Sequence, residues 1–396
     1  MSAITAYNLF APDVKENPYP YYHWLLREQP VYCNEKLGFW ALSRYEDVEA
    51  AARAPEVFSS AQGIGPDRQP GANMIVKDPP EHARLRKLVS KAFTPRRVEQ
   101  LAPRIHEIVA ELMDAAMARE RFDLIQDLAH PLPVIVIAEM LGVEAEHRDA
   151  FKRWSDDVVH IVAAGSNEQS MGQYMQSWEA FKAYFVELIE RRRRDPQDDL
   201  LSALVIAQEE SDALTLSEVL NTCLLLLVAG NETTTNLIGN AALALFTHGS
   251  EGLKLRQRPE LVTSMIEEVL RFDSPIQGVF RTTMREVEVR GVTIPADSKV
   301  ALLWAAANRD PEVFPNPDVF DIEREGERHL AFGMGIHFCL GAPLARLEAR
   351  IATEVILRRT RSLRPDPEGQ IERVDNPMFR GLKRCPVVVE PASVHP

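Results

Sequence analysis

The segment from Phe332 to Gly341 carries one cysteine, Cys339, in a setting that favours thiolate chemistry. Glycines within it allow backbone angles and close approaches that other side chains block, so a flat ligand could lie against the loop. Ala342 and Pro343 then begin a predicted helix, since proline suits a first helical turn. The unpaired N–H groups of a helix start stabilise a negative sulfur. The spacing therefore predicts a loop that presents Cys339 to a ligand.

This segment resembles the haem-binding loop of the cytochrome P450 superfamily. The matching positions are Phe332, Gly333, Gly335, His337, Cys339 and Gly341. The resemblance implies haem b (iron protoporphyrin IX), with the Cys339 thiolate as iron ligand and with Phe332 and His337 beside the cofactor. A single cysteine in a chain of this composition is usually a small buried hydrophobe. The ten-residue context favours the ligand.

A second unusual segment, Ala229-Gly230-Asn231-Glu232-Thr233-Thr234, interrupts an apolar helix predicted over residues 217–246. Glycine and hydroxyl residues weaken a helix, although Gly230 could permit a helix crossing and threonines can bond to the preceding turn. The segment also resembles the oxygen-binding helix of the same family. That resemblance implies that dioxygen lies beside Ala229 and Gly230, that Thr233 donates a hydrogen bond and that Glu232 relays protons. Glutamate stands where some members have aspartate.

Two basic residues, His82 and Arg86, follow a helix start at Asp78-Pro79-Pro80-Glu81. Four residues apart, they project from the same side of that helix. The bland interpretation is the border of an amphipathic helix. In the resembling family a histidine and an arginine at this spacing bind the haem propionates, and Arg281 matches a third such donor. With His337, this gives four donors for two carboxylates.

Glu268 and Arg271 share a helical face at i,i+3 and can pair. Exposed pairs of this kind are common and contribute little to stability. The resemblance to the Glu-x-x-Arg helix of the family implies a buried cluster with Arg324, whose role is to hold the irregular segment under Cys339.

Helical patterns dominate the chain, with further helices predicted over residues 98–117, 127–141, 150–162 and 174–194. Strand patterns form a hairpin over residues 30–42, a main β region over residues 275–294 and a closing strand at residues 385–389. Length alone would favour two or three domains. The resemblance runs from about Pro18 to Val389 and implies one domain over residues 1–396, mainly α with a small β portion, in the cytochrome P450 fold.

Composition narrows the class of protein further. The chain is 45% hydrophobic and 26% charged, as in a soluble globular protein, and its net charge of −13 argues against a nucleic-acid partner. The start of the chain carries no signal or anchor pattern, and the most apolar run, residues 223–230, is too short to span a bilayer. Four scattered cysteines favour neither zinc nor disulfides. We expect a cytoplasmic monomer without membrane attachment.

The resemblance implies a monooxygenase that hydroxylates or epoxidises a hydrophobic small molecule. Because no GxGxxG segment is present to bind a nicotinamide or flavin cofactor, electrons from NAD(P)H must arrive through a ferredoxin or flavodoxin and its reductase. We expect that partner near Arg84, Lys87 and Arg346. Two alternatives stay open: a peroxide-driven peroxygenase, which would not need Glu232 and Thr233, and a haem-binding sensor without catalysis.

Similarity also implies where the substrate lies. The implied walls are mostly apolar: residues 59–74, residues 162–172, Leu226 with Ala229, residues 276–280, and Met378 with Phe379. Such walls suit a medium to large hydrophobic molecule, such as a terpenoid, polyketide, steroid or fatty acyl compound.

Overall fold

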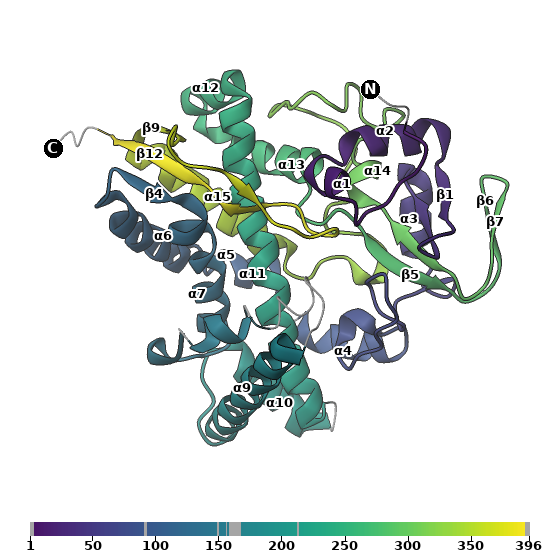
Figure 1. Cartoon of the computed structure of the whole chain (residues 1–396). Coiled ribbons are helices and arrows are strands. Elements are labelled where there is room, and N and C mark those ends of the chain that lie inside the picture. The colour runs from purple at the N-terminus through teal and green to yellow at the C-terminus, as the bar shows by residue number, and fades with distance from the viewer. Residues whose placement is uncertain are drawn as a thin grey trace.

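The computed structural model describes residues 4–90, 93–148, 150–155, 157, 168–211 and 214–392. Helix α11 (Leu216–Thr247) runs through the middle of the molecule, with helices packed around it and a sheet-bearing part to one side (Figure 1). The fold is mainly α with a small β portion, as predicted. Among the described residues, no helix is both long and apolar enough to cross a membrane.

The other helices range from 4 residues in α14 to 27 residues in α9. They are α1 (Pro12–Glu16), α2 (Tyr19–Glu28), α3 (Tyr45–Arg53), α4 (Glu81–Val89), α5 (Pro95–Glu99), α6 (Ala102–Met117), α7 (Pro131–Met140), α9 (Glu168–Arg194), α10 (Leu200–Ser211), α12 (Gly249–Gln257), α13 (Val262–Phe272), α14 (Trp304–Ala307) and α15 (Ala342–Arg359).

The largest sheet has the strand order β1-β2-β8-β5-β3, in which β2 and β8 are parallel and the other pairs antiparallel. Its strands are β1 (Val31–Asn34), β2 (Phe39–Leu42), β3 (Phe58–Ser59), β5 (Val279–Thr283) and β8 (Lys299–Leu302). The smaller sheets contain β4 (Arg121–Asp123), β6 (Val287–Val289), β7 (Val292–Ile294), β9 (Thr360–Pro365), β10 (Glu372–Arg373), β11 (Leu382–Arg384) and β12 (Pro386–Pro391).

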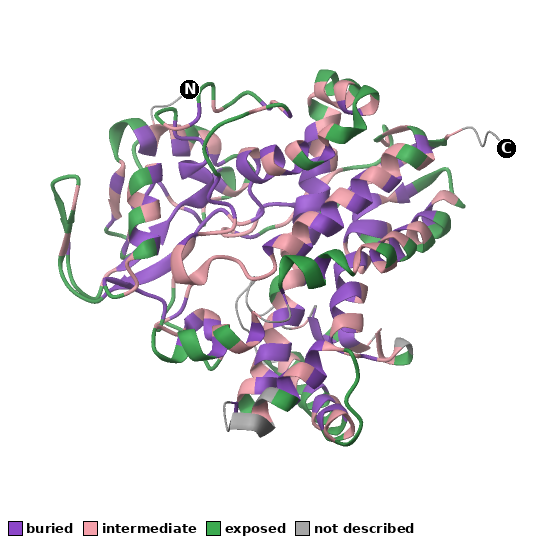
Figure 2. Ribbon diagram, turned by 180° about the vertical axis from the view of Figure 1, so that it is seen from behind, coloured by how far each residue is buried: buried purple, intermediate pink, exposed green. Residues whose placement is uncertain are grey.

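Helix α11 begins with a capping box, in which the side chains of Thr215 and Glu218 bond to each other's backbone N–H groups. Its apolar residues are buried along most of its length, and it packs against α7, α13 and α15. Figure 2 shows burial concentrated in this interior, while the hairpin β6–β7 projects into solvent. The predicted interior helix is confirmed.

The predicted helix over residues 98–117 is wrong in one respect, because it is divided into α5 and α6. Pro103 stands in the first turn of α6, where its missing N–H breaks no helical hydrogen bond. The helix expected over residues 127–141 is likewise divided, into a π-helical turn (Ile125–Ala129) and α7, which begins at Pro131. Of the helix expected over residues 150–162, residues 150–155 and 157 are helical, and the others lie outside the described residues.

The predicted Glu268–Arg271–Arg324 cluster is confirmed. The Arg271 Nε and Nη2 atoms donate to the two Glu268 carboxylate oxygens at 2.7 and 2.8 Å, and Arg324 Nε donates to the same group at 3.2 Å. Both arginines also donate to the carbonyl of Val319. The cluster therefore fixes the irregular chain that leads toward the cysteine loop.

Candidate functional site

The cysteine loop, Phe332–Gly341, contains a short 3₁₀ turn (Gly335–His337) and ends where α15 begins. The Cys339 N–H donates to the carbonyl of Phe332 at 2.9 Å, which closes the loop, and the thiol is half-buried. Burial raises the pKa of Cys339, while hydrogen bonds from the backbone N–H groups of Gly341 and Ala342 oppose that rise. The predicted placement of the sulfur at a helix start is confirmed.

The loop glycines serve a narrower purpose than we expected. Gly333 and Gly335 have φ angles of 68° and 71°, which favour glycine. A Cβ on Gly335 would lie 2.3 Å from the carbonyl oxygen of Ala52 in α3, so this glycine lets the loop pack on the protein itself. Gly341 has open space where a side chain would stand.

The four predicted basic groups come together from three elements of the fold. His82 and Arg86 lie on α4, Arg281 lies on β5 and His337 ends the 3₁₀ turn. The rings of His82 and His337 are 4.4 Å apart between centroids, and Arg86 Nη2 donates to the carbonyl of Phe338 at 2.6 Å. Residues 255 positions apart in the sequence (337 − 82 = 255) thus form one basic cluster.

A nearby carboxylate, Asp78, only partly offsets the burial of this basic cluster: it opposes the lowering of the pKa of His82 and of Arg281, and both pKa values still lie below their ordinary ones. Burial lowers the pKa of His337 to about 3, with Arg281, His82 and Arg86 adding repulsion, and burial lowers the pKa of Arg281 to about 10. The His337 Nε2 atom is buried without a hydrogen-bond partner in the described structure. Buried cations and orphaned donors are costly unless an acceptor is present. The cluster therefore fits a ligand with carboxylates, such as the propionates of haem.

The unusual segment of α11 keeps its helical hydrogen bonds while offering open space. Ala229 is exposed although the helix around it is largely buried, and a Cβ on Gly230 would meet no atom within 4 Å. The Thr233 hydroxyl donates to the carbonyl of Ala229 at 2.8 Å. Burial raises the pKa of Glu232 to about 7, so this carboxyl can carry a proton near neutral pH.

Sequence reasoning missed Glu348, on α15. Its side chain is buried, and its Oε1 atom has no hydrogen-bond partner in the part of the chain that the structure describes. Burial raises the pKa of Glu348 to about 8, opposed by a hydrogen bond from Thr234. The carboxyl is therefore protonated at neutral pH. Its spacing from Leu344 and Ile351 on one helical face was the available signal that it points inward.

The three residues expected at the partner surface differ in their surroundings. Arg346 Nε and Nη2 donate to Glu267 at 2.6 and 2.7 Å, and its guanidinium carbon lies 4.5 Å from the Phe332 ring centroid. Arg84 pairs with Glu218, while the Lys87 side chain is exposed. Lys87 is thus the simplest of the three to test.

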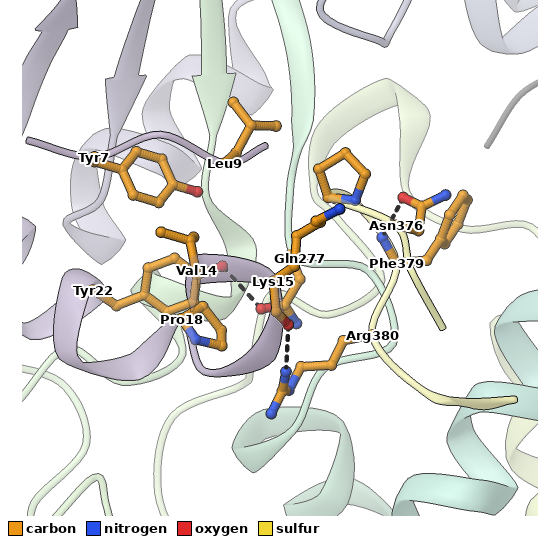
Figure 3. Close-up of a pocket in the computed structure, with 11 residues that line it drawn as sticks. Tyr7, Leu9, Val14, Lys15, Pro18, Tyr22, Gln277, Asn376, Phe379 and Arg380 are labelled. Atoms are coloured by element: carbon orange, nitrogen blue, oxygen red, sulfur yellow. Dashed lines mark hydrogen bonds between the residues drawn. The ribbon is translucent and has the colours of Figure 1, made fainter. Parts of the chain in front are cut away.

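Parts of the expected substrate walls are brought together. The Gln277 N–H donates to the Met378 carbonyl at 2.7 Å, and Ile276 forms a β-bridge with Phe379. Behind this pair lies a pocket near the N-terminal segment, where the Tyr22 hydroxyl donates to Gln277 (Figure 3). Its volume of about 10 Å³ holds roughly one water, so it is no substrate site. Of the wall expected at residues 162–172, residues 162–167 lie outside the described residues.

A cysteine loop ahead of α15, beside a basic cluster in a mainly helical fold, defines an oxidoreductase of the haem-thiolate class. A model of the cytochrome P450 family matches residues 36–257 and 253–387, and the chain belongs to that family. Its members use haem b, are named as monooxygenases or hydroxylases, and take electrons through redox partners.

Relatives cover nearly the whole chain. The vitamin D(3) 25-hydroxylase of Pseudonocardia autotrophica is 41% identical over 406 residues, which cover 98% of this chain and 97% of the relative. The structure of cytochrome P450 CYP109Q5 from Chondromyces apiculatus matches with a TM-score of 0.89 and 42% identity over 98% of each chain. That of CYP109E1 from Bacillus megaterium in complex with testosterone matches with a TM-score of 0.87 and 36% identity, covering 96% of this chain and 99% of that one.

Proposed function

We propose that the chain, as a single domain over residues 1–396, is a haem-thiolate monooxygenase that hydroxylates or epoxidises a medium to large hydrophobic small molecule. The observation that carries this proposal is the half-buried Cys339 at a helix start beside the basic cluster of His82, Arg86, Arg281 and His337, in which the His337 Nε2 atom is buried without a hydrogen-bond partner in the described structure. When bound, haem b supplies the iron at which dioxygen is reduced.

Each element contributes a defined part of the cofactor site. Cys339 supplies the iron ligand, and Phe332 packs beside the haem. His82, Arg86, Arg281 and His337 bind the propionates, which supply the acceptors that the basic cluster needs. Ala229 and Gly230 face the cofactor from α11, because their side of the helix offers open space.

Splitting dioxygen consumes protons, and three groups of this chain can supply them. Glu232 carries a proton near neutral pH, and Thr233 beside it can pass one through its hydroxyl. The buried, protonated Glu348 lies next to Thr234 in the same region and can replenish them.

Electrons come from NAD(P)H through a separate ferredoxin or flavodoxin and its reductase, which dock on the cysteine side near Arg84, Lys87 and Arg346. We place the enzyme in the cytoplasm as a monomer. The peroxygenase alternative is tested by comparing turnover with peroxide alone against turnover with redox partners and NAD(P)H. Faster turnover with peroxide alone would favour the peroxygenase, and binding without product formation would favour a sensor.

The substrate class follows from the apolar walls and from the relatives. One relative is named for vitamin D(3), and another is solved with testosterone, so we propose a molecule of steroid-like size. A screen of testosterone, vitamin D(3) and long-chain fatty acids, followed through the spin-state shift of the ferric haem, tests this choice. A shift with the fatty acids alone would overturn the steroid-like assignment.

A further inference from the structure

A lysine on strand β8, Lys299, is buried with 7% of its surface exposed, which is unusual for this residue type. Its ammonium nitrogen lies 3.1, 3.1 and 3.2 Å from the carbonyl oxygens of Gln62, Gly63 and Gly65. An ammonium group has three N–H donors. All three are therefore engaged by the backbone of one loop.

That loop is closed on itself. The Gly63 N–H donates to Ser60 at 2.9 Å, and the Gln69 N–H donates to Gln62 at 3.0 Å. Gly63 has a φ of 95°, and a Cβ there would lie 3.0 Å from the backbone of Gln69, so only glycine fits the turn without strain. Residues 60–69 thus form a compact Ω-like loop whose interior carbonyls converge on Lys299.

Two further residues contact this loop, Phe280 in the large sheet and Asp297 in the turn before β8. The Phe280 N–H of β5 donates to the Ile64 carbonyl at 2.8 Å. Arg68 Nη2 donates to the Asp297 carbonyl at 2.8 Å and pairs with its carboxylate at 2.7 Å. Because Arg281 follows Phe280 directly, the loop lies against the strand that carries a donor of the basic cluster.

Burial and two neighbouring arginines disfavour a positive charge on Lys299. Burial lowers its pKa to about 8, Arg68 and Arg281 add repulsion, and Asp67 opposes them. An apolar residue would suit β8 as well as its buried neighbour Val300 does, yet it would leave the Gly63 and Gly65 carbonyls without this donor and Gln62 with the Gln69 N–H alone. The ammonium group is therefore explained by the loop it binds and not by the sheet.

We propose that Lys299 is a positioning residue that fastens the loop of residues 60–69 to the sheet and thereby fixes one wall of the substrate site. This inference rests on the proposed function for the claim that the loop borders a haem pocket. The attachment of the loop to the sheet is independent of that claim.

The first test is hydrogen–deuterium exchange of the haem-loaded protein carrying Lys299→Met. Peptides covering residues 60–69 should exchange about tenfold faster than in the parent, as expected when buried carbonyls lose their donors. Peptides from α11 should change little. Lys383→Met, which removes an exposed lysine from strand β11, is the matched control and should leave the loop unchanged. Unchanged loop exchange, or equal acceleration throughout the chain, would overturn the proposal.

The second test measures the wall through two ligands of the ferric haem iron. Imidazole is small and should bind Lys299→Met with an affinity within about twofold of the parent. Clotrimazole is a bulky azole, and its affinity for Lys299→Met should differ from its affinity for the parent by about tenfold. Lys299→Arg keeps the positive charge on a planar guanidinium group, so its clotrimazole affinity should lie between those of the parent and Lys299→Met. An equal change in affinity for both azoles, or no change for either, would refute the claim that Lys299 fixes a wall of the substrate site. If the parent binds no haem, the exchange comparison is made on the haem-free proteins; a loop that still responds to Lys299→Met then leaves the attachment standing while the proposed function fails.

Discussion

The Thr233 hydroxyl offers the most direct test at the scale of single residues. Thr233→Ala removes the proposed proton donor and should raise the ratio of NAD(P)H consumed to product formed on the order of tenfold, with peroxide released. Product and peroxide are quantified together under turnover. Thr247→Ala is a matched control, because Thr247 makes the same type of bond, to Leu243 at 2.8 Å, near the far end of α11. Tight coupling in Thr233→Ala would remove this residue from proton delivery.

Glu232 gives a pH dependence whose sign follows from its raised pKa. The pKa of about 7 exceeds the ordinary 4.5, so the group carries its proton up to neutrality and loses it as the pH rises through about 7. The contribution of this raised pKa to the stability of the folded protein is complete below pH 4.5 and is lost as the pH rises through about 7. Coupling efficiency should therefore fall above pH 7, and Glu232→Gln should flatten that part of the profile. An identical profile in the variant would contradict the assignment.

Sequence reasoning reached the residues that lie in short motifs, such as Cys339 and Thr233, because their spacing is local. It could not show that His82 and His337 lie 4.4 Å apart, since tertiary packing brings them together. Lys299 was missed for the same reason. Its three acceptors lie more than 230 residues earlier in the chain, and nothing in the sequence of β8 indicates them.

At the scale of elements, the buried Glu268–Arg271–Arg324 cluster should dominate the stability of the cysteine side. Glu268→Gln leaves the buried guanidinium of Arg271 and the partly buried one of Arg324 without their counter-charge and should lower the free energy of unfolding by about 3–5 kcal/mol. Glu49→Gln, in the partly exposed Glu49–Arg53 pair, should lower it by at most about 0.5 kcal/mol. Urea unfolding of both variants makes the comparison. A similar loss of unfolding free energy in both variants would show that the cluster contributes no more to stability than an exposed ion pair does.

Long helices such as α11 and α15 could be predicted because an apolar face repeats along their sequences. The short strands β4, β8 and β9 were not predicted, since three to six residues carry too little periodicity. They form through partners far away: β4 and β9 both pair with β12 at the end of the chain. The break between α5 and α6 depends on one proline, Pro103, so the sequence contained the signal for it. The apolar spacing alone continues across the break and predicts a single helix.

At the scale of the whole molecule, the proposed docking of a redox partner on the cysteine side can be tested through surface charge. Lys87→Glu should slow the first electron transfer several-fold at low ionic strength, and the difference should shrink as salt screens the charge. Stopped-flow reduction with a ferredoxin measures it. Lys36→Glu, in the exposed turn between β1 and β2, is the control. Equal rates for both variants would move the docking surface elsewhere. Arg346 is a poorer probe, because its reversal would also break the contact with Glu267.

The central claim is that Cys339 is the thiolate ligand of a haem iron in this chain. The measurement that tests it most directly is the absorption spectrum of the reduced, carbon monoxide-bound protein. The parent should show the red-shifted band of a thiolate-ligated haem. Cys339→Ser should lose this band and keep the far-ultraviolet circular dichroism of the parent, because the fold is unchanged. A red-shifted band that survives in Cys339→Ser would contradict the account.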